Sequence, residues 1–213
     1  MGICYIVGSG DCTETINPGK GDLLIAADGG ADHIARMGLT PDLLLGDLDS
    51  LGSALPACPL LRYPAEKDDT DMALAVEEGV LRGYREFLIF GVLGGPRLDH
   101  TLAAVSLLPG YAARGLSVTL VGGGQRVRAL AAGQEIVFSP RREGYLSLFA
   151  TGGEAAGITA ENLKYPLADA ALPPHITLGV SNEFLSGRAA RVAVGQGAVL
   201  LVWQQPWQEG EEK

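Results

Sequence analysis

The distribution of apolar runs limits the fold most strongly, because its character changes once along the chain. Up to about residue 124, short apolar runs alternate with helix-like segments. A strand followed by a helix, repeated, is typical of a mostly parallel sheet with helices on both faces. The apolar runs that we predict to be strands in this half are residues 3–8, 23–28, 42–47, 60–64, 87–92 and 118–123. We therefore predict a doubly wound α/β domain.

Two segments of this half carry apolar residues at the three-to-four spacing of a helix. In residues 71–84 and 98–111 these apolar residues are Leu74, Val76, Val80 and Leu81, and then Leu98, Leu102, Val105 and Leu108. The spacing predicts two helices, each with an apolar face.

The second half of the chain loses the helical period after residues 122–125. Short β-like runs punctuated by Gly and Pro follow, at residues 126–131, 134–139, 144–150, 190–195 and 198–203. Such runs are typical of a small β-sandwich. We expect the boundary between residues 123 and 134, and assign residues 1–128 to the α/β domain and 129–213 to the sandwich.

Composition excludes several classes of protein. With 47% hydrophobic and 19% charged residues, the chain is not a disordered segment. A net charge of −9 argues against a nucleic-acid partner. No apolar run approaches the ~20 residues of a membrane helix, so we expect no membrane partner. Cys4, Cys12 and Cys58 form no C-x-x-C pair, and with no basic, apolar leader at residue 1 they indicate a reduced, cytoplasmic protein.

The aspartates are unevenly placed. Eight of the twelve lie between Asp28 and Asp71. Four predicted strands are each followed by carboxylates, namely Asp28; Asp47 and Asp49; Asp68, Asp69 and Asp71; and Asp99. Ligands of open α/β sheets bind beyond the carboxyl ends of the strands. The sequence therefore predicts an acidic rim at that edge of the sheet.

Helix capping is an alternative for part of this rim. Asp68 or Asp69 would cap a helix that begins near Thr70, and Asp99 would do the same for the next helix. Asp47 and Asp49 are harder to explain in this way, because carboxylates so close repel each other unless a cation lies between them. Oxygen ligands without His or Cys pairs favour Mg²⁺, and Mg²⁺ on such a rim suggests phosphoryl transfer. The glycine stretches "GSGD", "ADGGAD" and "GVLGG" either approach phosphates or simply make turns.

Five segments, in order along the chain, resemble the thiamine pyrophosphokinase family: "ADGGADHIARMGLTPDLLLGDLDS", "EKDDTDMALAV", "RLDHTLA", "NLKYPL" and "TLGVSNEF". The resemblance spans nearly the whole chain. It implies an α/β catalytic domain that binds ATP and Mg²⁺, a β-sandwich that binds thiamine, and a homodimer with active sites shared between subunits. The implied reaction moves a pyrophosphoryl group from ATP to the hydroxyl of thiamine and releases AMP.

The resemblance also implies roles for particular residues. The Mg²⁺ ligands would be Asp47, Asp49 and Asp71, and the catalytic residues Asp49, Asp71, Arg97 and Asp99. The nucleotide would be contacted by Asp28, Gly29, Asp68 and Thr70, and thiamine by Ser181, Asn182 and Tyr165. Tyr165 has an alternative place in the sandwich core. The sequence departs from the family's G-G-R at Pro96, which separates Gly95 from Arg97.

Two other functions fit part of the pattern. "LLLGDLDS" also resembles the first motif of haloacid-dehalogenase-type phosphatases, in which Asp47 would be a nucleophile and Asp49 an acid/base. That motif usually opens the chain, and we find no later α/β strand with a lysine followed by an acidic pair. A non-catalytic thiamine or nucleotide sensor is the third hypothesis, which an intact acidic set disfavours.

Overall fold

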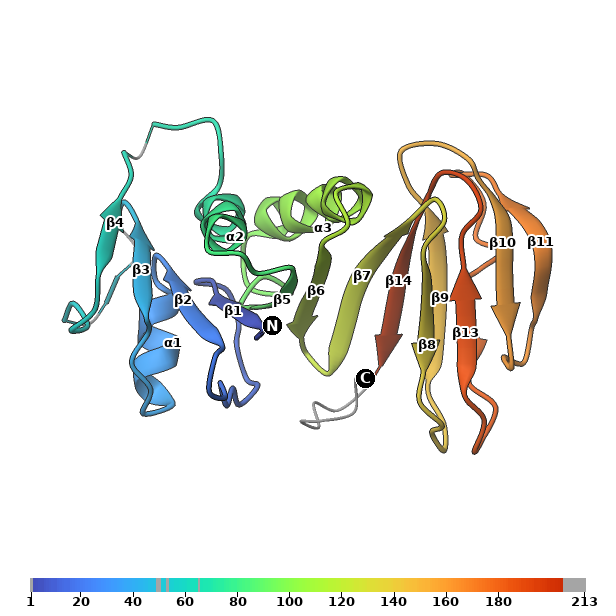
Figure 1. Ribbon diagram of the computed structural model, residues 1–213, viewed down its shortest axis with the longest axis horizontal. Coiled ribbons are helices and arrows are strands. Elements are labelled where there is room, and N and C mark those ends of the chain that lie inside the picture. Colours follow the sequence, from blue (N-terminus) through green and yellow to red (C-terminus); the bar gives the residue numbers. More distant parts are fainter. Residues whose placement is uncertain (1, 49–50, 53, 65, 205–213) are drawn as a thin grey trace. The chain divides into compact units, whose positions relative to one another are not determined.

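The structure is a computed structural model that describes residues 2–48, 51–52, 54–64 and 66–204 (Figure 1). Its contacts divide the chain into two compact units, each considered separately below. Unit 1 comprises Met1–Ser106 and Leu116–Gly123, and unit 2 comprises Leu107–Gly115 and Gly124–Lys213.

Unit 1 contains a parallel sheet in the order β6-β5-β1-β2-β3-β4. Its strands are β1 (Cys4–Val7), β2 (Leu23–Ala27), β3 (Leu43–Gly46), β4 (Leu60–Arg62), β5 (Glu86–Phe90) and β6 (Ser117–Gly122). Every residue of β1, β2 and β3 is buried, as expected of parallel strands covered on both faces. The predicted doubly wound α/β architecture is confirmed.

Helix α1 (Gly30–Arg36) lies on one side of this sheet and α2 (Asp71–Leu81) on the other (Figure 1). The face that α2 buries agrees with the predicted one at Val76 but is otherwise different, because Met72 and Gly79 are buried whereas Leu81 is 81% exposed. Gly79 permits this close packing, since an added Cβ would lie 2.5 Å from the Phe87 ring of β5. A stripe that includes a glycine is not recognised by a search for large apolar residues.

Helix α3 (Leu98–Ala113) begins in unit 1 and ends in unit 2, with Pro109 inside it. Its predicted apolar face is buried at Leu108 but not at Leu98 and Leu102, which are 67% and 59% exposed. The spacing correctly predicts a helix here. It does not determine which end of the stripe the fold covers, because burial depends on neighbours that are distant in sequence.

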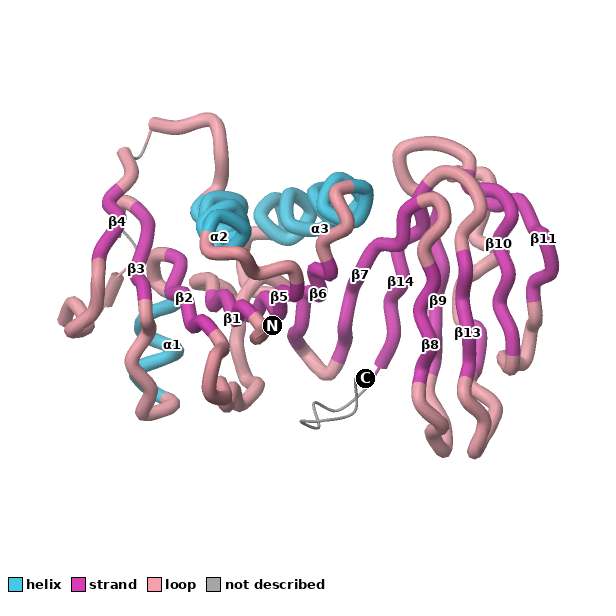
Figure 2. Tube along the Cα trace, viewed as in Figure 1, coloured by secondary structure: helices cyan, strands magenta, loops and turns pink. Residues whose placement is uncertain are grey.

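Unit 2 is a sandwich of two antiparallel sheets, in the orders β12-β9-β14-β7 and β11-β10-β13-β8. Its strands are β7 (Gln125–Ala131), β8 (Glu135–Phe138), β9 (Tyr145–Ala150), β10 (Ala155–Glu161), β11 (Leu167–Leu172), β12 (Asn182–Glu183), β13 (Ala190–Ala193) and β14 (Ala198–Gln204). In the described residues from 124 onward, Figure 2 shows strands and loops. The predicted sandwich is confirmed, although β10, β11 and β12 were missed.

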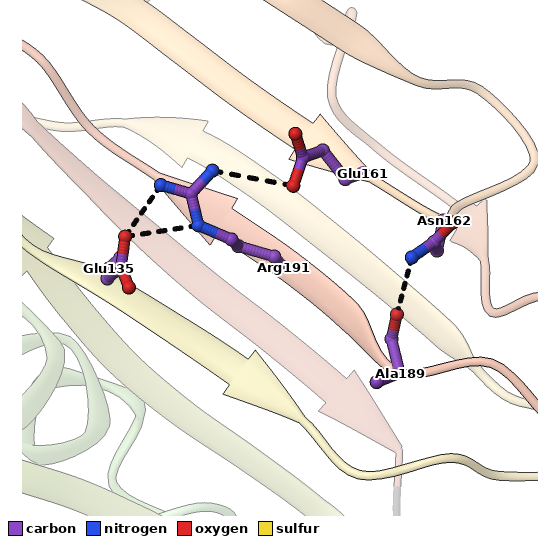
Figure 3. A network of polar contacts seen from close by, with 5 residues as sticks. All are labelled: Glu135, Glu161, Asn162, Ala189 and Arg191. Carbon is purple, nitrogen blue, oxygen red and sulfur yellow. Dashed lines mark hydrogen bonds and ion pairs between the residues drawn. The ribbon is translucent and has the colours of Figure 1, made fainter.

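The sandwich core is apolar and rich in aromatic rings. Phe138 makes edge-to-face contacts with Trp203 and Phe184, with centroids 5.4 and 5.3 Å apart. On the sheet formed by β11, β10, β13 and β8, Arg191 of β13 forms ion pairs with Glu135 of β8 and Glu161 of β10 (Figure 3).

None of the helices in the described part of the chain has the length and apolarity needed to cross a bilayer.

Candidate active site

The order of strands in unit 1 places a topological switch point between β1 and β5, because the chain continues to β2 on one side and to β6 on the other. The loops after these two strands are held together by glycines. Gly10 N–H donates to Gly91 O (2.9 Å), and a Cβ added to Gly10 would lie only 2.7 Å from that oxygen. Gly91 adopts φ +67, a conformation that glycine takes without strain. The glycines of "GSG" and "GVLGG" therefore permit close backbone approach.

A cavity of about 1090 Å³ opens at this edge of unit 1. Large concave sites of this kind, with several polar groups directed into them, are the usual places for small-molecule binding. The residues that line it are Gly8, Ser9, Gly10, Ala27, Asp28, Gly29, Asp32, His33, Ala35, Arg36, Asp47, Gly52, Thr70, Asp71, Met72, Gly91, Val92, Gly94, Pro96, Arg97, His100, Thr101 and Ala104.

Three of the predicted rim carboxylates, on Asp28, Asp47 and Asp71, line this cavity together. Asp28 directly follows β2, Asp47 follows β3, and Asp71 is the first residue of α2. Asp28 is only 8% exposed, and its backbone N–H donates to Leu45 O (2.8 Å). The predicted gathering of carboxylates is therefore seen in the structure for these three residues, from two strand ends and the start of one helix.

The backbone around the carboxylates adopts uncommon conformations. Asp28 and Leu48 have φ +50 and +70, and Gly46, which ends β3, has φ +138. A leucine with positive φ is strained, and such strain is found preferentially at functional sites. The Asp32 side chain of α1 contacts the backbone beyond β3, because its Oδ2 accepts the Gly52 N–H (2.8 Å).

Thr70 is the residue that caps α2. Its Oγ1 accepts the Ala73 N–H (3.2 Å), so the idea that Asp68 or Asp69 caps this helix is wrong. Thr70 also lines the cavity, whereas Asp68 is exposed and is not among the lining residues. Lys67 forms an ion pair with Asp71 (Nζ to Oδ1, 3.0 Å) and so places one cation beside the rim.

Arg97 lines the cavity together with Pro96. Its guanidinium donates two hydrogen bonds to the Asp99 carboxylate, from Nε to Oδ1 (2.9 Å) and from Nη2 to Oδ2 (2.7 Å). These bonds lower the pKa of Asp99 to about 2 and raise that of Arg97. Asp99 itself is exposed and is not among the residues that line the cavity. It therefore orients Arg97 and does not point into the cavity.

Within the described residues, no group of three His, Cys, Asp or Glu side chains is close enough to hold a metal ion. Asp49, which we expect to be a ligand and a catalytic residue, lies outside the described residues. The expected set of Asp47, Asp49 and Asp71 therefore stays a prediction.

Several lining residues had not been predicted, namely Ser9, His33, Arg36, His100 and Thr101. Ser9 lies in the "GSGD" stretch and the other four lie in the first and third family-like segments, but the sequence does not single out these five side chains within those segments. The signal that points to Ser9 is topological, because it follows β1 at the switch point. Thr101 has a structural task there, since its Oγ1 donates to Val92 O (2.9 Å) and fixes α3 to the loop after β5.

Unit 2 contains a smaller cavity of about 230 Å³, lined by Gln125, Tyr145, Ser147, Ser181, Val202, Trp203 and Gln204. Ser181, which we predicted to contact thiamine, is among them. It has φ +59, and its N–H donates to the Ser147 Oγ (3.0 Å). A strained polar residue at a cavity fits a binding role.

The other two predicted contacts, Asn182 and Tyr165, do not line this cavity. Tyr165 is 58% exposed, so its alternative place in the sandwich core is wrong. Asn182 is 4% exposed, and its side-chain amide is hydrogen-bonded to the backbone of Tyr165. Whether either residue contacts a ligand stays a prediction.

Comparison with known protein families gives two matches in sequence order. Residues 19–120 match the model "Thiamin pyrophosphokinase, catalytic domain", and residues 134–199 match "Thiamin pyrophosphokinase, vitamin B1 binding domain". The first match covers Asp28, Asp47 and Asp71, and the second covers Ser181.

Individual relatives agree with these matches. The chain is 27% identical to the thiamine pyrophosphokinase of Bacillus subtilis, over 84% of this chain and 86% of that protein. The crystal structure of the Bacillus subtilis thiamine pyrophosphokinase has the same fold, with a TM-score of 0.84 at 24% identity over 96% of this chain and all of that one. The thiamin pyrophosphokinase structure from Geobacillus thermodenitrificans gives a TM-score of 0.82 at 27% identity, over 96% and 98% of the two chains.

Proposed function

Because the chain belongs to the thiamin pyrophosphokinase family, we propose that it transfers a pyrophosphoryl group from ATP to the hydroxyl of thiamine, releasing AMP. One structural observation carries the proposal: carboxylates from three separate elements, Asp28, Asp47 and Asp71, line a single cavity at the switch point of the sheet. Nothing in the comparisons favours the phosphatase or the sensor.

The large cavity is the proposed site for ATP with Mg²⁺. Mg²⁺ prefers oxygen ligands and usually takes one or two carboxylates, with phosphate and water as the others. The donors on the cavity wall fit this preference, so Asp47 and Asp71, together with Asp49, would hold the ion. When bound, it would offset the charge of the phosphates. Asp28, Gly29 and Thr70 line the same cavity and are the proposed nucleotide contacts. Asp68, exposed beside them, stays a predicted contact only.

The Arg97 guanidinium is proposed to stabilise the charge that develops on the transferred group. Asp99 holds the guanidinium at two points, which fixes its direction at the cavity wall. With its pKa lowered to about 2, Asp99 is a poor proton acceptor, since a general base works best with a pKa near the working pH. The thiamine hydroxyl would therefore lose its proton to a carboxylate of the rim other than Asp99.

Thiamine is proposed to bind residues 129–213, and ATP to bind residues 1–128. Ser181 and Ser147 line the smaller cavity, where their hydroxyls can donate or accept hydrogen bonds. The exposed Tyr165 offers an aromatic face to an aromatic ligand. Each position is compatible with an aminopyrimidine, which has both polar edges and a flat face.

We further propose that the enzyme is a cytosolic homodimer in which each active site combines the first domain of one chain with the second domain of the other. Large apolar side chains exposed in both units are candidates for an interface between copies, which would cover them. They are Leu98 and Leu102 on α3, and Tyr145, Phe149 and Leu178 in unit 2. The three free cysteines fit a reducing compartment.

The reaction is tested by incubating the purified protein with ATP, Mg²⁺ and thiamine, and measuring AMP and thiamine diphosphate by chromatography. We expect the two products in equal amounts, and no AMP when thiamine is omitted. Inorganic phosphate as the main product would indicate a phosphatase, and no product at all would indicate a sensor. Either result would overturn the proposal.

Asp71→Asn tests the acidic rim within the same assay. Loss of one charged oxygen at the proposed Mg²⁺ site should lower kcat by at least about a hundredfold. The matched control is Asp69→Asn, which removes an exposed carboxylate two residues away and should leave kcat unchanged. Equal losses in both variants would mean that general acidity of this segment, and not the rim, supports turnover.

A further inference from the structure

Asn182 stands out in unit 2 because its side chain forms three hydrogen bonds with the backbone. Its Oδ1 accepts the N–H groups of Tyr165 and Glu183, both at 2.9 Å, and its Nδ2 donates to Tyr165 O (2.7 Å). An asparagine amide has two acceptor and two donor positions, so three of the four are occupied. With the residue 4% exposed, the amide is an internal group.

The two segments that Asn182 joins are far apart in sequence. Its Nδ2 and Oδ1 reach both polar backbone groups of Tyr165, as a neighbouring strand would. Lys164 N–H donates to Glu183 O (2.9 Å), and the Lys164 and Glu183 side chains form an ion pair (2.6 Å), so the contact continues on the solvent side. These contacts join the segments around Tyr165 and Asn182, and this junction fixes the backbone of Tyr165 while its ring stays exposed.

We propose that Asn182 is a positioning residue: it does not touch thiamine, and acts by fixing the backbone of Tyr165 so that the exposed ring forms one wall of the thiamine site. The proposal rests on the proposed function for the identity of the ligand. It replaces the direct contact that the sequence suggested for Asn182, because a buried amide with three backbone bonds has little left to offer a ligand.

Hydrogen exchange tests the junction without any substrate. In Asn182→Ala, the backbone amides of Tyr165 and Glu183 lose their acceptor and should exchange at least about tenfold faster. In Ser181→Ala, the same amides should be unchanged. If Tyr165 stays equally protected in Asn182→Ala, the side chain does not hold it and the proposal is overturned.

A double-mutant cycle tests how the effect reaches thiamine. We expect Asn182→Ala to lower kcat/KM for thiamine roughly tenfold or more, with the KM for ATP unchanged. In a Tyr165→Ala background, the same substitution should cost almost nothing further, because the ring it positions is gone. If the fold losses in kcat/KM of the two single variants multiply in the double variant, Asn182 acts independently of Tyr165, as a direct contact would, and the proposal is overturned. A wild-type protein that makes no AMP would instead refute the proposed function, and the exchange result would still stand.

Asn162→Gly is the matched control. Asn162 lies three residues before Tyr165, and its Nδ2 also donates to a backbone oxygen, that of Ala189 (2.8 Å; Figure 3). Its φ of +56 suits glycine, so the variant removes this hydrogen bond without backbone strain. Exchange at Tyr165 and kcat/KM for thiamine should both be unchanged. A loss equal to that of Asn182→Ala would mean general loosening of the segment and contradict a specific role.

Asn182→Asp keeps the test usable if the alanine variant fails to fold. Its carboxylate still accepts the two N–H groups, but places a negative oxygen against Tyr165 O. A protonated carboxyl can donate there, as the amide does. Its kcat/KM for thiamine, relative to wild type at the same pH, should therefore rise as the pH falls. A ratio independent of pH would contradict the assigned hydrogen bond.

Discussion

Arg97 and Asp99 illustrate what single side chains contribute to this site. The bidentate pair is exposed, so its electrostatic energy is largely screened by water and its worth to stability is small. Its importance is directional, because a planar guanidinium held at two points keeps one orientation at the cavity wall. Pro96 does not prevent this arrangement, since Arg97 lines the cavity directly after it.

The pKa of Asp99 provides a test at this scale. A carboxyl ¹³C titration should give a value of about 2 for the wild type. In Arg97→Gln, the value should rise toward the ordinary 3.8 because the main cause of the shift is removed. A carboxyl whose pKa is lower in the folded than in the unfolded protein stabilises the fold at pH values above the unfolded-state pKa. This contribution is lost as the pH falls toward 2. An unchanged pKa in the variant would show that the pair does not form in solution.

Among the elements, α2 shows how a glycine determines helix packing. Gly79 lies where the helix passes the Phe87 ring and the Cys4 thiol, and an added Cβ would approach them to 2.5 and 3.0 Å. Burial of Cys4 in this contact raises the pKa of its thiol to about 12, so the group stays neutral. Asp71 and Thr70 stand at the start of the same helix, and its close packing therefore helps to place them at the rim.

Two helical glycines form a matched pair for a stability measurement. Alanine usually favours a helix over glycine by about 0.5–1 kcal/mol. At Gly110 of α3 nothing lies within 4 Å of an added Cβ, so Gly110→Ala should raise the free energy of unfolding by about that amount. At Gly79 the clash should dominate, and Gly79→Ala should lower it by about 1–3 kcal/mol. Urea unfolding of both variants checks the signs, and a stabilised Gly79→Ala would contradict the packing described here.

At the scale of the whole molecule, the chemistry is divided between two units. The acidic cavity lies in unit 1, whereas Ser181, Tyr165 and the smaller cavity lie in unit 2. If ATP binds the first unit and thiamine the second, as proposed, both units contribute residues to the reaction. In a two-fold dimer with sites shared between chains, every site would take one unit from each chain.

Complementation between two variants, one inactive and one impaired toward thiamine, tests this assembly. Asp71→Asn and Asn182→Ala are unfolded together and refolded as an equal mixture. Random pairing makes half of the dimers mixed, and in each mixed dimer one site collects both changes and the other none. About a quarter of the wild-type activity should therefore return. No recovery, with mixed dimers confirmed by mass spectrometry, would mean that each site is built within a single chain.

The order of residues along the chain is enough to identify much of this architecture. Local periodicity predicts the strands before Asp28 and Asp47, because a strand buried on both faces needs a continuous apolar run. Carboxylates after several such strands predict an acidic edge, since parallel strands end on the same side of a sheet. The change from alternating elements to short strands predicts the sandwich, although the alanine-rich β10 and β11 contain few of the β-branched and aromatic residues that mark a strand.

Other features depend on contacts between segments that are distant in sequence. Strand pairing places β1 beside β5 and so brings Ser9 and the glycine loops to the cavity. Tertiary packing leaves Leu98 exposed while it buries Asn182, although residue type favours the reverse. Periodicity and propensity describe a residue's immediate neighbours, whereas burial and hydrogen-bond partners are set by whichever segment the fold places opposite.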